Sequence, residues 1–285
     1  MSIARKREAK KHKSCDPFDP GLRPRIFWLM VDWMVWNIFS TPLELAITSL
    51  AVALVGLSKG GLGGMSLLGV PLMALVMPPF KAASILLPVL IIMDIVSVSS
   101  WRGWVNWSIF RLLFPGALVG IAVGWATAEI VSDSVVRVIV GIVSLAFVLR
   151  AVAGTVSDPI STGSGTSARV WGGLAGYASF VAHAGAPPLQ IYMIPLRLDP
   201  RLFTGTCVMF FAATNVIKLI PYAAMGGLDI NNLARAGTML PLAIFATYLG
   251  SWIVRHMRAS VFYPFTYASV ALVGLKLIWD GIAGI

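Results

Sequence analysis

Charged side chains are scarce in this chain. Asp, Glu, Lys and Arg make up 12% of its 285 residues, whereas a soluble domain carries about 25%. The two cysteines, Cys15 and Cys207, are too few for a disulfide framework and lack metal-ligand spacing. The chain contains no GxxxxGK[ST], GxSxG, HExxH or CxxC motif, so ATP is excluded as an energy source within it. We expect no metal and no cofactor.

Hydrophobic residues dominate the chain. They make up 58% of the sequence, and the mean hydropathy is +0.83. Long apolar runs such as 135–149 and 262–275 have few or no charges, as a membrane span requires. These runs do not alternate between apolar and polar residues, which argues against a membrane β-barrel. The sequence therefore predicts an all-α polytopic membrane protein.

Basic residues gather at the amino-terminal end. Eight of the 22 Lys and Arg residues lie in the first 25 positions, and the formal net charge is +10. A basic segment ahead of a hydrophobic body is typical of a cytoplasmic tail near anionic lipid, so we expect no nucleic-acid partner. We predict a basic cytoplasmic tail over 1–25. The tryptophan-rich stretch 26–41 is predicted to be an amphipathic helix in the membrane interface.

The hydrophobic part of the chain contains an internal repeat. Sliding the chain along itself by 121 residues matches Gly64 with Gly185, Pro79 with Pro200, and Asp94 with Asn215. We therefore predict membrane repeat 1 over 42–153 and membrane repeat 2 over 170–285. The polar, glycine- and serine-rich stretch 154–169 is predicted to be the linker between them.

Each repeat contains five apolar segments. They are 42–57, 64–77, 82–100, 109–129 and 134–153 in the first copy, and 170–182, 186–197, 202–223, 233–254 and 262–281 in the second. The first two of each copy are shorter than the roughly 20 residues of a straight span, so they either cross as thin spans or re-enter. An odd count places the two copies in opposite orientation, as inverted repeats. Charges in the loops leave the membrane orientation open.

Both copies are interrupted at the same place, by SKGGLGG at 58–64 and by AHAGAPP at 182–188. Non-helical backbone at membrane depth is tolerated only inside protein or beside a water-filled cavity. A helix that restarts after the break directs its free N–H groups and positive dipole end into that cavity. The paired breaks predict one small, positive anion pocket. The alternative is that the glycines only allow tight helix packing.

The candidate substrate-binding residues lie in and around the breaks. They are Ser58, Lys59, Gly60, Gly61, Gly63, Gly64, Ser66, His183, Gly185, Gln190 and Asn215. Asp94 and Lys218 are the candidates for ion coupling or charge pairing, because an ionisable group inside a span is costly to keep there. The alternatives are a purely structural ion pair between Asp94 and one lysine, and a spacer role for His183.

The segments GLSKGGLGGMSLLGVPLMAL and PPFKAAS, followed by GYASFVAHAGAPPLQIYMIPL and DPRLFTG, identify a resemblance. Together they resemble the TauE/SafE-type sulfite exporter family over about residues 42–282. The resemblance implies a bacterial inner-membrane permease for sulfite, sulfonates or related organic anions. It also implies secondary transport driven by the proton gradient or another ion gradient.

We therefore expect a secondary transporter, most simply an exporter, with a midplane anion site. An anion channel is the first alternative, and a membrane-embedded enzyme using His183 and Asp94 is the second. The enzyme is disfavoured because no nucleophile–base pair stands at readable spacing. The expected partners are a small anion and the lipid bilayer. The anion itself, import against export, the coupling ion, and monomer against homodimer stay open.

Overall fold

The computed structural model describes residues 39, 41–62, 68–128, 130–153, 165–226 and 229–283. Within these ranges every regular element is a helix. The helices of the first copy are α2 (Pro42–Leu57), η1 (Ser58–Leu62), α3 (Gly69–Ala74), α4 (Pro79–Trp101), α5 (Trp107–Thr127) and α6 (Asp133–Val152). Those of the second are α7 (Gly165–Val181), α8 (Ala186–Met193), η3 (Ile194–Leu196), α9 (Pro200–Ala224), α10 (Ile230–His256) and α11 (Ala259–Ala283).

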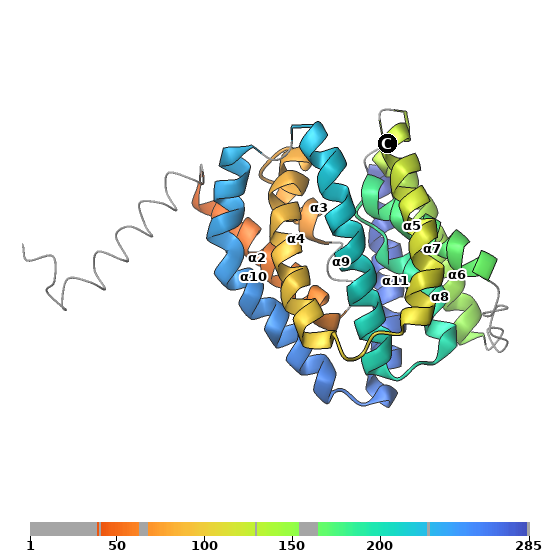
Figure 1. Ribbon diagram of the computed structural model, residues 1–285. Helices are drawn as coiled ribbons and strands as arrows, with labels where there is room; N and C mark the ends of the chain where they lie inside the picture. Colours follow the sequence, from red (N-terminus) through yellow and green to blue (C-terminus); the bar gives the residue numbers. More distant parts are fainter. Residues whose placement is uncertain are drawn as a thin grey trace, which may run out of the picture.

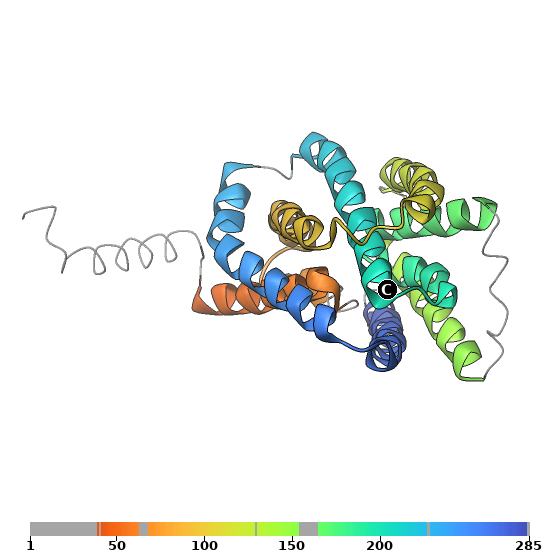
Figure 2. The same cartoon turned by 60° about the horizontal axis from the view of Figure 1, so that its bottom comes forward.

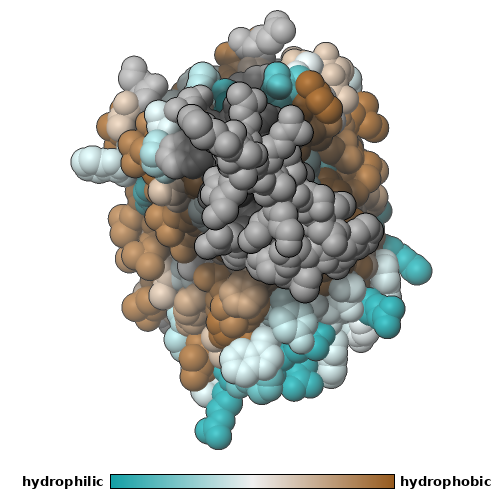
Figure 3. All heavy atoms as spheres, turned by 90° about the vertical axis from the view of Figure 1, so that its left-hand side faces the viewer, coloured by the Kyte–Doolittle hydropathy of each residue, from teal (hydrophilic) through white to brown (hydrophobic). Residues whose placement is uncertain are grey.

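Seven of the described helices are long and apolar enough to cross a membrane. They are α2 continued through η1, α4, α5, α6, α9, α10 and α11. In Figure 3, hydrophobic surface flanks the middle of the face that the view presents, and hydrophilic groups gather toward its lower end. The prediction of an all-α polytopic membrane protein is confirmed for the described chain.

Of the four segments predicted to be short, the two that follow the breaks form short helices, α3 and α8. The prediction is wrong for 42–57, because α2 continues through η1 into a helix of 21 residues that is long enough to cross a membrane. The eight residues of α8 extend about 12 Å at 1.5 Å per residue, against a hydrocarbon core of about 30 Å. The six residues of α3 are shorter still. Neither helix is long enough to cross the core by itself.

Equivalent helices of the two copies pack on one another. Among the described helices, α4 contacts its equivalent α9, and α6 contacts its equivalent α11. The contact of α2 with α10 in turn corresponds to the contact of α7 with α5. Exchanging the two copies leaves this set of contacts unchanged. Figure 1 shows that α4 and α9 run in opposite directions: α4 leads into α5 at the bottom, and α9 leads into α10 at the top. Figure 2 shows α9 in the centre, with α2, α4 and α10 on one side and α5 to α8 on the other.

The predicted domain boundaries can be compared with the structure only within the membrane body. The tail, 1–25, and the interfacial helix, 26–41, lie outside the described residues apart from 39 and 41. The sequence predicts a linker that extends to residue 169, but α7 already begins at Gly165. Residues 165–169 are therefore helical, and they lie close against α5, where a Cβ on Gly116 would meet the backbone of Arg169.

Candidate functional site

The first break turns the chain at a glycine. Helix α2 continues through η1 until Gly61, whose φ of 131° interrupts the helix. A residue with a side chain rarely adopts this backbone conformation, whereas glycine does so without steric penalty. Gly60 serves packing instead, since a Cβ there would meet the backbone of Thr247 and Ser251 in α10. Gly63, Gly64 and Ser66 lie outside the described residues.

The second break is built differently. Helix α7 ends at Val181, and His183 adopts a left-handed conformation with φ of 53°. Helix α8 then begins at Ala186, with Gly185 as its N-cap residue. Pro187 and Pro188 occupy its first turn and have no N–H to offer a ligand. The start of α8 therefore supplies few backbone donors, and positive charge at this site must come from side chains.

A charged cluster joins the first break to both central helices. Lys59 Nζ lies 2.7 Å from Asp94 Oδ1 on α4, and the two side chains are 11% and 4% exposed. Asn215 on α9 donates from Nδ2 to Asp94 Oδ2 over 2.6 Å. The Lys59 ammonium also lies 5.5 Å from the centre of the Phe211 ring. The ion pair considered from the sequence is therefore present, and its basic member is Lys59.

Lys218 is the second lysine of the site, and it is buried. It is 1% exposed, and its Nζ donates to Ser179 O over 3.1 Å and to Ser179 Oγ over 3.2 Å. Ser179 lies in the last turn of α7, where unpaired carbonyl groups carry partial negative charge. Among the described residues no carboxylate lies within ion-pair distance of Lys218. Its nearest hydrogen-bond acceptors are therefore the carbonyl and hydroxyl groups at the end of α7.

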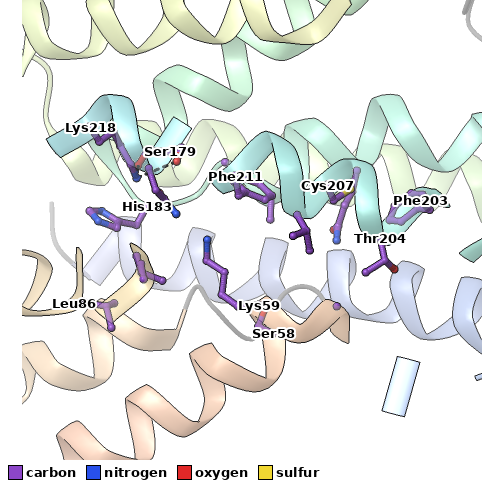
Figure 4. Close-up of a pocket in the computed structure, with 17 residues that line it drawn as sticks. Ser58, Lys59, Leu86, Ser179, His183, Phe203, Thr204, Cys207, Phe211 and Lys218 are labelled. Atoms are coloured by element: carbon purple, nitrogen blue, oxygen red, sulfur yellow. Dashed lines mark hydrogen bonds between the residues drawn. The ribbon is translucent and has the colours of Figure 1, made fainter. Parts of the chain in front are cut away.

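These residues surround a cavity of about 90 Å³. The predicted residues that line it are Ser58, Lys59, Gly61, His183, Gly185, Gln190, Asn215 and Lys218. Figure 4 shows Lys59 reaching toward the cavity from one wall, with Lys218, His183 and Phe211 on the other side. Gly60 and Asp94 are not lining residues. Gly60 instead packs against α10, and Asp94 binds the lining residue Lys59.

Sequence reasoning missed several lining residues, above all Ser179, Thr204, Cys207 and Phe211. Thr204 Oγ1 is buried and has no hydrogen-bond partner, so it is a donor and acceptor open to a ligand. The repeat offset was a usable signal, because Ser179 lies 121 residues after Ser58. Leu86 with Cys207 and Leu90 with Phe211 are lining pairs at the same offset.

A second cavity, of about 200 Å³, lies next to the first. Arg137, Tyr222 and His183 are among its lining residues, and His183 also lines the first cavity. His183 Nε2 lies 3.5 Å from the Tyr222 hydroxyl oxygen. His183 therefore stands between the inner cavity and the wider space beside it.

The inner cavity is suited to holding an anion. Two basic side chains, Lys59 and Lys218, line it, whereas the one acidic side chain of the cluster, Asp94, is held behind Lys59. No group of three metal-ligating side chains occurs within the described ranges. Two lysine side chains beside one carboxylate, two serine hydroxyls and an unpartnered threonine are the kinds of group that bind a small oxyanion in proteins.

The comparison with protein families agrees with this chemistry. The family model for the sulfite exporter TauE/SafE matches residues 48–277, which includes both breaks and every described lining residue of the inner cavity. No curated protein and no solved structure matches the chain. The chain belongs to the sulfite exporter TauE/SafE family, a family of membrane transporters.

Proposed function

We propose that this protein is a secondary transporter that exports small sulfur-containing anions across the bacterial inner membrane. Sulfite, sulfonates and related organic anions are the substrate class. The family supports transport of this class. The observation that carries the proposal is the meeting of Lys59 from one copy and Lys218 from the other in one buried cavity.

The size of the cavity favours the small members of this class. Its volume of about 90 Å³ is well below the roughly 300–1,000 Å³ of pockets that hold drug-sized ligands. Sulfite and short sulfonates have few heavy atoms and a compact charge. The apolar part of the lining, including Leu86 and Phe211, suits a short hydrocarbon group beside that charge.

Asp94 is proposed to couple transport to protons. Its carboxylate holds the Lys59 ammonium at 2.7 Å, so an incoming anion competes with Asp94 for the same cation. A proton on Asp94 removes the competing charge and frees Lys59 for the anion. Proton binding and anion binding then favour each other, so the proton and the anion move in the same direction. Export is then driven by the outward gradient of the anion, and a pH gradient changes the rate of that export.

The two copies are proposed to form inverted repeats around the cavity. The lining pairs Ser58 with Ser179 and Leu86 with Cys207 are related by the repeat offset. The opposite directions of α4 and α9 support the same arrangement (Figure 1). Inverted copies allow alternating access, since each copy adopts in turn the conformation of the other and opens the site to the other side.

Sulfite flux in proteoliposomes tests the proposal. The wild type is expected to move sulfite and to exchange it in counterflow, whereas Lys59→Met and Lys218→Met lower apparent affinity about tenfold or more, equivalent to about 1.4 kcal/mol. Lys276→Met is the matched control, because Lys276 pairs with Asp280 outside the cavity. Wild-type flux in both cavity variants removes the two lysines from the mechanism. Current without counterflow identifies a channel instead.

A further inference from the structure

Two arginines meet on tryptophan rings away from the inner cavity. Arg201 lies in the first turn of α9, and its guanidinium carbon is 5.1 Å from the centre of the Trp104 ring. Arg255 lies in the last turn of α10, with its guanidinium carbon 5.3 Å from the centre of the Trp101 ring. These cation–π contacts restrain both guanidinium groups, which lowers the conformational entropy that is lost when a ligand binds.

Neither guanidinium is neutralised by a carboxylate of the described chain. The Arg201 guanidinium donates to the backbone oxygen of Arg255 over 3.4 Å, and the Arg255 guanidinium donates to the backbone oxygen of Ser100. Asp199 lies nearby, but it accepts from the backbone N–H of Arg201 and caps α9. The remaining N–H groups of both arginines stay available for an oxyanion.

Arg201 and Arg255 line two adjoining hollows. One, of about 370 Å³, is lined by Trp104, Arg201, Arg255 and His256. The other, of about 220 Å³, shares Trp104, Arg201 and Arg255 with it. Neither shares a described lining residue with the inner cavity.

We propose that Arg201 and Arg255 form a second oxyanion site, separate from the inner cavity and placed at the end of the molecule where α4 and α10 finish. Its ligand is a small oxyanion with several oxygen atoms on one centre, either the transported sulfur oxyanion or the phosphate of a lipid headgroup. Planar guanidinium groups bind such oxygens in pairs, as lysine does not. The identity of the sulfur oxyanion rests on the proposed function.

The position also links this site to the first break. Trp101 beneath Arg255 is fully buried, and its Nε1 donates to Gly60 O over 3.0 Å. Gly60 follows Lys59 directly in η1. An oxyanion on Arg255 would therefore be separated by one side chain, that of Trp101, from the segment that carries Lys59.

Counting bound sulfite tests the second site. Equilibrium dialysis of radiolabelled sulfite against protein in phospholipid-free detergent is expected to find two sites in the wild type. Arg201→Gln/Arg255→Gln is expected to retain the inner site alone, and Lys59→Met/Lys218→Met the outer site alone. Arg258→Gln, which removes an exposed arginine that lines neither hollow, is the charge control and keeps both.

The outcomes separate this proposal from the proposed function. If the wild type binds a single sulfite and Arg201→Gln/Arg255→Gln binds none, the result supports the outer site and contradicts the inner one. Short-chain phosphatidylglycerol bound in place of sulfite, and lost with the same pair, supports the site with a lipid headgroup as its ligand. Unchanged binding of both probes in Arg201→Gln/Arg255→Gln overturns the proposal of an outer site.

A second variant covers the case in which the glutamine variants fail to fold. Arg201→Lys/Arg255→Lys keeps the charge, and its affinity for the probe is expected to fall at least about threefold because the planar groups are lost. Wild-type affinity in that variant also overturns the proposal.

Discussion

Asp94 and Asn215 occupy the same position in the two copies and bind each other directly. Asn215 Nδ2 donates to Asp94 Oδ2 over 2.6 Å, and the two residues are 121 apart in the chain, the repeat offset itself. In the proposed inverted-repeat arrangement, equivalent positions meet only near the axis that relates the two copies. The contact between α4 and α9 would then lie near that axis, together with the cavity that Asn215 lines. One member of the pair is charged and the other neutral, so the site is asymmetric where the backbone is matched.

Replacing Asp94 with Asn is expected to uncouple transport from protons. The amide keeps the shape of the side chain but neither repels an anion nor exchanges a proton. Sulfite binding at neutral pH should therefore be at least as tight as in the wild type, while an imposed pH gradient no longer accelerates flux. Flux measured with and without a gradient checks this. A wild-type response to the gradient in Asp94→Asn would assign the coupling proton to another group.

The Lys59–Asp94 pair is expected to show strong non-additivity in stability. Lys59→Met alone leaves a buried carboxylate without its cation, which costs about 3–5 kcal/mol. Lys59→Met/Asp94→Leu removes both charges and is expected to recover most of that loss. Thermal unfolding of both single variants and the double variant in detergent measures the coupling. Additive losses would show that the two charges do not interact in the folded protein.

Gly61→Ala is expected to destabilise the first break. A side chain at φ 131° is strained by about 1–3 kcal/mol, and the added Cβ would lie 2.6 Å from Thr204 Cγ2. Gly237→Ala in α10 is the control, because a Cβ there meets nothing within 4 Å and alanine gains up to about 1 kcal/mol of helix propensity. Thermal unfolding should move in opposite directions for the two variants. A neutral Gly61→Ala would contradict the backbone turn at this glycine.

Cys207→Phe is expected to block the inner cavity. Cys207 lines the cavity together with its counterpart Leu86, so a phenyl ring there occupies the space meant for the anion. Overpacking costs about 1–3 kcal/mol, which the thermal midpoint reports separately from binding. Cys207→Ala, which opens space, should keep sulfite binding. Sulfite dialysis on both variants checks this, and normal binding in Cys207→Phe would place the anion elsewhere.

The sequence alone is sufficient for the class of the protein, the helices and the positions of the breaks. Apolar length identifies membrane helices, and the glycine and proline clusters mark where they stop, because both signals are local in the chain. The offset of 121 residues also pairs Asp94 with Asn215 directly from the order of the residues. The limits of α7 are less predictable, since its first turn is polar and depends on contact with α5.

Which charges meet is decided by the tertiary structure. In the sequence, Lys59 and Lys218 are equal candidates to pair with Asp94. In the structure η1 packs against α4, so Lys59 forms the ion pair with Asp94, while Lys218 donates to the backbone at the end of α7. Gly60 serves packing and Gly61 the backbone turn, although both stand in one glycine run. Arg201 and Arg255 lie 54 residues apart and meet only where α9 begins and α10 ends. Local patterns reflect the preferences of each segment for the membrane, whereas partners for buried charges depend on which segments approach within a few ångströms.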